Sequence, residues 1–207
     1  AKTLTALGLV LLDESKMEEA ERSTRDALER VRRSNPREDV MVGSAMRALG
    51  KVLALRGSYE QAIPMLEKAS ALQSRGPDTP ELSDTLTDLA NALYNVGRYD
   101  ESEALNKRLL ERDRQLYGER HPAVAIDLFN LGNLALDRGE YADAERRLRK
   151  SLTIIEDWYG KDQPKAASSL LMLGVALESL GRITEAESLY RQALVIQTRV
   201  YGRAHVL

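Results

Sequence analysis

The sequence predicts an all-α protein that folds as an α-solenoid of stacked antiparallel helix pairs. Three observations lead to this prediction. Glycines recur at a step of 42 residues, and prolines recur at the same step. Apolar residues between them follow helical spacing. The chain is 43% hydrophobic but only 5% aromatic, which favours a core of leucine and alanine, the residues with the highest helix propensity.

The period appears in three sets of residues, and one unit is two residues shorter because Gly57 lies 40 residues before Gly97. Such internal repeats indicate a solenoid, in which each unit stacks on its neighbours. The sets are Gly97, Gly139 and Gly181; Gly76, Gly118, Gly160 and Gly202; and Pro80, Pro122 and Pro164.

Each unit predicts two helices, as the fourth unit shows. Pro122 suits the first helical position, and Gly139 suits the left-handed C-terminal cap. A second helix follows from Tyr141 and ends before Gly160. The ten predicted helices cover residues 1–13, 17–33, 39–56, 59–74, 80–96, 99–117, 122–138, 141–159, 164–180 and 183–201.

Small residues occupy one position in each helix of a pair. Glycine inside a helix costs about 1 kcal/mol relative to alanine, so its recurrence predicts a compensating close approach of the paired helices. The first helices carry Gly8, Gly50, Ala90, Gly132 and Gly174, and the second helices carry Ala20, Ala62, Ser102, Ala144 and Ala186.

With its Leu-Gly pairs, loop glycines and following tyrosines, the pattern resembles the tetratricopeptide repeat (TPR) family. The 42-residue period and the linker Gly118-Glu119-Arg120-His121-Pro122 resemble its kinesin light chain subgroup. The resemblance implies a right-handed superhelix of five repeats, 1–37, 38–77, 78–119, 120–161 and 162–203, in one solenoid. The sequence departs from the family pattern at Thr24 and Asn106, where a large apolar residue is usual, and at Val40, where proline is usual.

The composition argues against several classes of protein. A net charge of −2 favours no nucleic-acid partner, because nucleic acid requires a concentrated basic face. No apolar run reaches the roughly 18 residues of a membrane-spanning helix. The absence of cysteine excludes thiolate chemistry and fits a cytoplasmic location.

No motif predicts catalysis, a metal site or a cofactor. The two histidines, His121 and His205, hold equivalent linker positions, which favours turns or helix caps. The basic cluster Arg146, Arg147, Arg149 and Lys150 is interpreted as a solvated face, with contact to an acidic partner or a nucleic-acid backbone as the alternative.

The ends of the sequence suggest that it is part of a longer protein. The last predicted helix carries Leu189, Val195 and Ile196 without a following helix to cover them. Because natural repeat arrays end in polar caps, we expect possible self-association through the uncapped terminal helices.

The resemblance further implies that the first helix of each repeat lines a concave groove where partners bind. Counting from the Leu-Gly position places Ile126 and Ser168 on this face, together with the predicted binding residues. These are Arg47, Lys51, Thr87, Asn91, Tyr94, Asn95, Phe129, Asn133 and Leu171.

The chemistry of this set suits a peptide. Asparagine both donates and accepts, so Asn91 and Asn133 can hold a peptide amide. Arg47 and Lys51 can take a carboxylate, and Tyr94 and Phe129 offer rigid apolar area. The alternative for each residue is a solvated or helix-packing role.

The sequence therefore predicts a protein–protein interaction scaffold that binds a protein or peptide partner. One alternative is a regulatory segment that senses a short peptide for an attached effector domain. A self-contained enzyme is a further alternative, which the lack of a catalytic motif disfavours.

Overall fold

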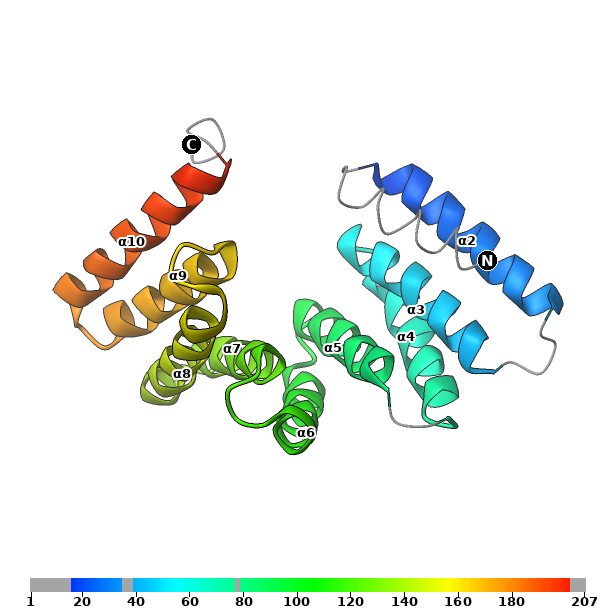
Figure 1. Cartoon of the computed structure of the whole chain (residues 1–207), viewed down its shortest axis with the longest axis horizontal. Coiled ribbons are helices and arrows are strands. Elements are labelled where there is room, and N and C mark those ends of the chain that lie inside the picture. Colours follow the sequence, from blue (N-terminus) through cyan, green and yellow to red (C-terminus); the bar gives the residue numbers. More distant parts are fainter. Residues whose placement is uncertain (1–15, 35–38, 77–78, 202–207) are drawn as a thin grey trace. The chain divides into compact units, whose positions relative to one another are not determined.

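The computed structural model describes residues 16–34, 39–76 and 79–201. Within these ranges the chain is helical and contains no strand, as the sequence predicts. Neighbouring helices pack side by side and run in opposite directions (Figure 1). The chain divides into two compact units, Ala1–Leu105 and Asn106–Leu207.

Every helix that the structure describes begins and ends within one residue of its predicted range. The predicted helix at 1–13 lies outside the described residues. Unit 1 contains α2 (Met17–Ser34), α3 (Val40–Leu55), α4 (Tyr59–Gln73), α5 (Pro80–Asn95) and the start of α6 (Tyr99–Tyr117). Unit 2 contains the rest of α6, then α7 (Pro122–Asp137), α8 (Tyr141–Tyr159), α9 (Pro164–Ser179) and α10 (Ile183–Tyr201).

The predicted glycine caps are confirmed. Gly139 has a φ of 75°, and its N–H donates to the carbonyl of Leu136 at 3.0 Å. The next N–H, from Glu140, donates to the carbonyl of Ala135 at 2.8 Å, so two end carbonyls of α7 are satisfied. A positive φ recurs at Gly57, Gly97, Gly118, Gly160 and Gly181.

Replacing Gly139 with alanine should lower the free energy of unfolding by about 1 kcal/mol, because a left-handed backbone is unfavourable for any residue with a Cβ. Urea titration followed by circular dichroism measures this change. Alanine at Gly76, for which the structure gives no positive φ, is the comparison. An equal loss from both substitutions would contradict the cap assignment.

The starts of the first helices follow the linker sequence. Proline is the first residue of α5, α7 and α9. In α3, where Val40 replaces it, Asp39 caps the helix by accepting from the N–H of Met41 at 2.9 Å and of Val42 at 3.2 Å. Nδ1 of His121 accepts from the N–H of Ala123 at 3.2 Å, so the predicted cap role of His121 is confirmed.

The small residues lie where paired helices approach closely. A Cβ added at Gly132 would come within 2.7 Å of the Leu148 side chain, and one at Gly50 within 2.8 Å of Leu66. At Gly174 the Tyr190 ring would lie only 2.3 Å away. The predicted close approach is therefore confirmed at three of these positions.

The two polar departures from the family pattern, Thr24 and Asn106, are buried and hydrogen-bonded. The Thr24 hydroxyl donates to the Ala20 carbonyl at 2.9 Å, and Asn106 Oδ1 accepts from Asn130 Nδ2 at 3.1 Å. Hydrogen bonds thus offset part of the cost of burying polar groups in these helices.

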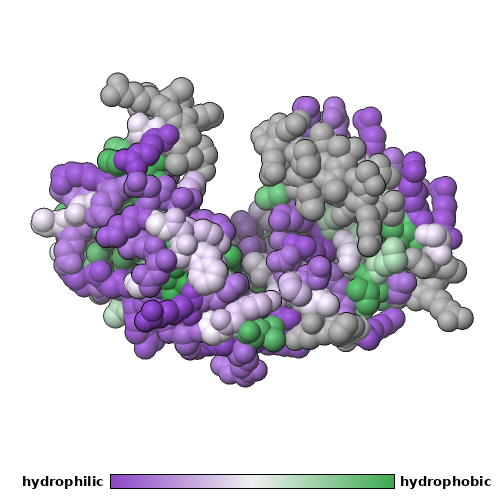
Figure 2. All heavy atoms as spheres, in the orientation of Figure 1, coloured by the Kyte–Doolittle hydropathy of each residue, from purple (hydrophilic) through white to green (hydrophobic). Residues whose placement is uncertain are grey.

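The residues drawn in colour in Figure 2 are mostly hydrophilic on the face in view, with hydrophobic residues in small patches. In the described part of the chain, no helix is long and apolar enough to cross a membrane.

Candidate functional site

The predicted binding residues lie on the first helices of the repeats, and they fall into both units. Unit 1 holds those of α3 and α5, and unit 2 holds those of α7 and α9. The residues of unit 1 are Arg47, Lys51, Thr87, Asn91, Tyr94 and Asn95, and those of unit 2 are Phe129, Asn133 and Leu171.

In unit 1, the positive charge of Arg47 is already matched by two carboxylates of α5. Its Nη1 lies 3.2 Å from Asp84 Oδ2, and its Nε lies 3.0 Å from Asp88 Oδ2. The Asp88 side chain is only 15% exposed. Burial raises the pKa of Asp88, against the opposing charges of Arg47 and Lys51. A peptide carboxylate at Arg47 would therefore compete with both aspartates.

The other predicted residues of unit 1 form a polar, accessible stretch of α5. Asn91 and Asn95 are exposed, and Asn95 Nδ2 donates to the Asn91 carbonyl at 2.8 Å. The half-buried Thr87 hydroxyl donates to the Ser83 carbonyl at 3.0 Å. The Tyr94 ring lies 5.5 Å from the Tyr99 ring, which limits its freedom. This stretch therefore offers hydrogen-bonding groups to a partner.

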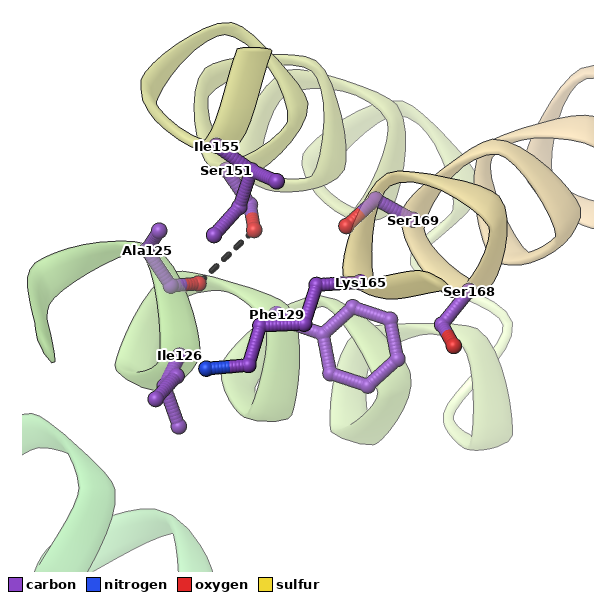
Figure 3. Close-up of a pocket in the computed structure, with 8 residues that line it drawn as sticks. All are labelled: Ala125, Ile126, Phe129, Ser151, Ile155, Lys165, Ser168 and Ser169. Carbon is purple, nitrogen blue, oxygen red and sulfur yellow. Dashed lines mark hydrogen bonds between the residues drawn. The ribbon is translucent and has the colours of Figure 1, made fainter. Parts of the chain in front are cut away.

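In unit 2, a pocket of about 180 Å³ opens between α7, α8 and α9 (Figure 3). Phe129 forms one wall, and the hydroxyl of Ser151 is turned away to donate to the Ala125 carbonyl at 2.7 Å. The walls are mostly apolar, so the pocket suits an apolar group of a ligand. The lining residues are Ala125, Ile126, Phe129, Ser151, Ile155, Lys165, Ser168 and Ser169.

Asn133 lies one helical turn after Phe129 on the same stripe of α7. Its Oδ1 is buried, and among the described residues it has no hydrogen-bond partner. A buried acceptor without a donor costs about 1–3 kcal/mol. Leu171 of α9 is half-buried and lies outside the pocket lining.

Lys165 supplies a positive charge beside the pocket. Its side chain is exposed and lines the pocket, and its Nζ lies 5.3 Å from the centre of the Tyr159 ring. The ammonium can attract a carboxylate of a bound partner, although exposed ion pairs contribute at most about 1 kcal/mol.

Sequence counting placed Ile126, Phe129 and Ser168 on this surface, and the structure brings all three to the pocket. Counting missed Ser151 and Ile155 because it considered only first helices, whereas these residues come from α8. It also missed Lys165 and Ser169, which lie on α9 outside the counted stripe. No sequence signal marks where packing leaves a space, since that depends on the volumes of neighbouring side chains.

Unit 2 also buries two carboxylates where α6 faces α7. Asp127 is 2% exposed and Asp113 is 4% exposed. Asp127 Oδ2 has no hydrogen-bond partner in the described part of the chain. Burial, reinforced by the charge of Asp113 and opposed by Arg114, raises the pKa of Asp127 from its usual 3.8 to about 8. Asp127 is therefore mostly protonated at neutral pH.

The remaining candidates for chemistry have structural explanations. Arg147 and Arg149 of the basic cluster pair along α8 with Asp143 at 2.5 Å and Glu145 at 2.8 Å, and Lys150 pairs with Glu119 at 2.6 Å. Across residues 16–34, 39–76 and 79–201, no three His, Asp or Glu side chains are grouped to hold a metal ion. His205 lies outside these ranges.

A family model of the tetratricopeptide repeat matches residues 1–75, 81–157 and 128–199. None of the curated proteins matches the sequence.

Solved structures of repeat proteins resemble this fold. BtubC (BKLC) from P. vanneervenii aligns with a TM-score of 0.80 at 20% identity, covering 97% of this chain and 81% of that one. The repeats of a kinesin light chain-like protein from Podosopora anserina align with a TM-score of 0.77 at 18% identity, covering 97% and 95%. A Rap protein complexed with competence and sporulation factor aligns with a TM-score of 0.80 at 15% identity. The alignment covers 94% of this chain and 53% of the Rap protein. At these identities the likeness concerns the fold, and it includes the kinesin light chain-like repeats that the 42-residue period predicts.

Proposed function

The chain belongs to the tetratricopeptide repeat family, and from this premise we propose that it is a protein–protein interaction module that binds a peptide segment on its first helices. In unit 2 the proposed binding surface consists of α7 and α9 around the pocket at Phe129. The observation that carries the proposal is the pairing of this pocket with the unpartnered acceptor of Asn133.

The two features match the two parts of a peptide. An apolar side chain can leave water by entering the pocket, with a gain of about 25 cal/mol for each Å² of apolar surface buried. Because Asn133 Oδ1 is enclosed, a backbone N–H of the same segment can donate to it once the half-buried side chain turns outward, which removes the cost of an unmade hydrogen bond. Lys165 favours a segment with a carboxylate near the inserted side chain.

The polar stretch of unit 1 belongs to the same proposal. Asn91, Asn95 and Thr87 can bond to a peptide backbone without reading its sequence. Arg47 and Lys51 of α3 complete the proposed surface of unit 1, but the ion pairs of Arg47 with Asp84 and Asp88 favour a neutral segment there.

Peptides that bind the full chain can be selected from a random library. Replacing Asn133 with alanine should weaken their binding about tenfold, because a neutral hydrogen bond in a desolvated site is lost. The same substitution should raise the stability, since it removes a buried acceptor that has no partner and alanine has the higher helix propensity. Fluorescence anisotropy and urea titration measure the two effects.

Gln115→Ala provides the matched control, because this exposed side chain lies on α6, outside the proposed surface, and its Nε2 donates to Glu111 Oε1. It should change the affinity of peptides that contact Phe129 by less than twofold. Unaltered peptide affinity in Asn133→Ala would count against the proposed surface of unit 2.

A further inference from the structure

Ser169 sits deep in the unit 2 pocket and is nearly buried. It is 2% exposed, yet it lines the pocket. Figure 3 shows its hydroxyl directed toward the space between α7, α8 and α9, whereas the neighbouring Ser168 hydroxyl points away from that space. No residue in the described ranges forms a hydrogen bond with the Ser169 side chain. Ser169 is therefore a buried lining residue whose polar group is unused and lies beside apolar walls.

The repeat explains why this hydroxyl has no partner. Thr85 in α5 holds the position equivalent to Ser169, and its hydroxyl lies 2.7 Å from Gln73 Oε1 of the preceding helix. Ile155 lies as far from the start of α8 as Gln73 lies from the start of α4, so the two residues hold equivalent positions. The side chain of Ile155 cannot accept a hydrogen bond. The hydrogen bond that joins α4 to α5 is thus replaced in unit 2 by a cavity between an isoleucine and a serine.

The size of the pocket suits one aromatic ring. A cavity of about 150 Å³ in another protein holds benzene, so a pocket of about 180 Å³ can hold a ring with one small substituent. The Phe129 ring and the aliphatic walls favour an aromatic side chain by edge or face contact. The Lys165 ammonium beside the pocket disfavours lysine or arginine as the occupant.

We infer that Ser169 makes this pocket selective for a tyrosine side chain of the partner, whose phenol hydroxyl would bond to the Ser169 hydroxyl while its ring contacts Phe129 and Ile155. This inference rests on the proposed function, because it names the side chain that the same surface receives. A serine hydroxyl both donates and accepts, so it can pair with a phenol in either direction. A site that bonds a hydroxyl discriminates against the analogue that lacks it.

The test uses p-cresol and toluene, which are the side-chain analogues of tyrosine and phenylalanine. Both are titrated into the full chain with labelled isoleucine methyl groups, so that Ile126 and Ile155 report binding by NMR. Replacing Ser169 with alanine should lower the ratio of p-cresol affinity to toluene affinity about fivefold, the value of one neutral hydrogen bond. Ser179→Ala, which changes an exposed serine of α9 outside the pocket lining, is the matched control and should leave the ratio unchanged.

An affinity ratio that Ser169→Ala alters by less than twofold would overturn the inference. If selected peptides still depend on Asn133, that result would leave the proposed function in place. If neither compound shifts the signals of Ile126 and Ile155, and peptide binding is also insensitive to Asn133→Ala, both proposals fail. Circular dichroism of Ser169→Ala confirms that helical content is retained before the ratios are compared.

Discussion

Replacing Asp127 with asparagine should raise the free energy of unfolding on the order of 4 kcal/mol at pH 7, because each unit of pKa shift corresponds to about 1.4 kcal/mol. Asp127 is 2% exposed and holds its proton up to about pH 8, whereas the unfolded chain releases it near pH 4. Asparagine has nearly the same shape and never ionises. The substitution therefore removes the cost of keeping a carboxyl group neutral.

The dependence on pH has a definite sign. Between about pH 4 and pH 8 the folded protein binds a proton at Asp127 that the unfolded chain has lost, so stability falls as the pH rises through this window. Below pH 4 both states are protonated, and above pH 8 the penalty is constant. The gain from Asp127→Asn should be small at pH 4 and grow to its full value near pH 8.

Urea titrations at pH 4, 6 and 8 measure this gain. Asp137→Asn, which changes an exposed carboxylate of the same helix, is the matched control and should show no such growth with pH. A stability gain that is equal at all three pH values, or a loss at pH 8, would show that Asp127 is ionised in the folded protein.

Replacing Gly174 with alanine should destabilise the protein by about 2 kcal/mol, because overpacking costs about 1–3 kcal/mol in a close contact. A Cβ there would meet the Tyr190 ring at 2.3 Å. The ring cannot move aside freely, since its hydroxyl donates to Glu178 Oε2 at 2.7 Å. The clash outweighs the gain of about 1 kcal/mol in helix propensity.

The same substitution should stabilise the protein when Tyr190 is alanine, because the clash is gone and only the propensity gain remains. The two backgrounds form a double-mutant cycle, which isolates the contact between positions 174 and 190. Denaturant titration of the four proteins supplies the values. A loss of similar size in both backgrounds would mean that the glycine serves some purpose other than close packing.

The helices could be predicted because each boundary has a local chemical cause. Gly139 ends α7 through a left-handed backbone, and Pro122 begins it, so no long-range information is needed. The replacement of proline by Val40 was visible in the sequence, but the compensating cap at Asp39 became clear only from its hydrogen bonds.

Less of the candidate site than of the helices could be predicted from the sequence. Helical counting finds residues that share a stripe, such as Phe129 and Asn133, but it does not report which side chains neutralise one another. The pairing of Arg47 with Asp84 and Asp88 joins α3 to α5 across separate repeats. The pocket exists because the side chains of Ile155 and Ser169 leave space between α8 and α9. The identity of one residue does not reveal such a space, because it depends on all the side chains around it.

The raised pKa of Asp127 is another property that could not be predicted from the sequence. Its equivalents, Thr85 and Ser169, are neutral, so a carboxylate at this position looks like an ordinary polar substitution. Only its low exposure and its proximity to Asp113 change its chemistry.

The affinity of library-selected peptides for Phe129→Ala and for Arg149→Ala tests the central proposal most directly. Phe129 lines the pocket of unit 2, whereas Arg149 lies on α8 outside it, in an exposed ion pair with Glu145. We expect Phe129→Ala to weaken binding at least tenfold, as for an aromatic anchor, and Arg149→Ala to leave it unchanged. Undiminished binding by Phe129→Ala, or a loss confined to Arg149→Ala, would contradict a peptide site on the first helices of unit 2.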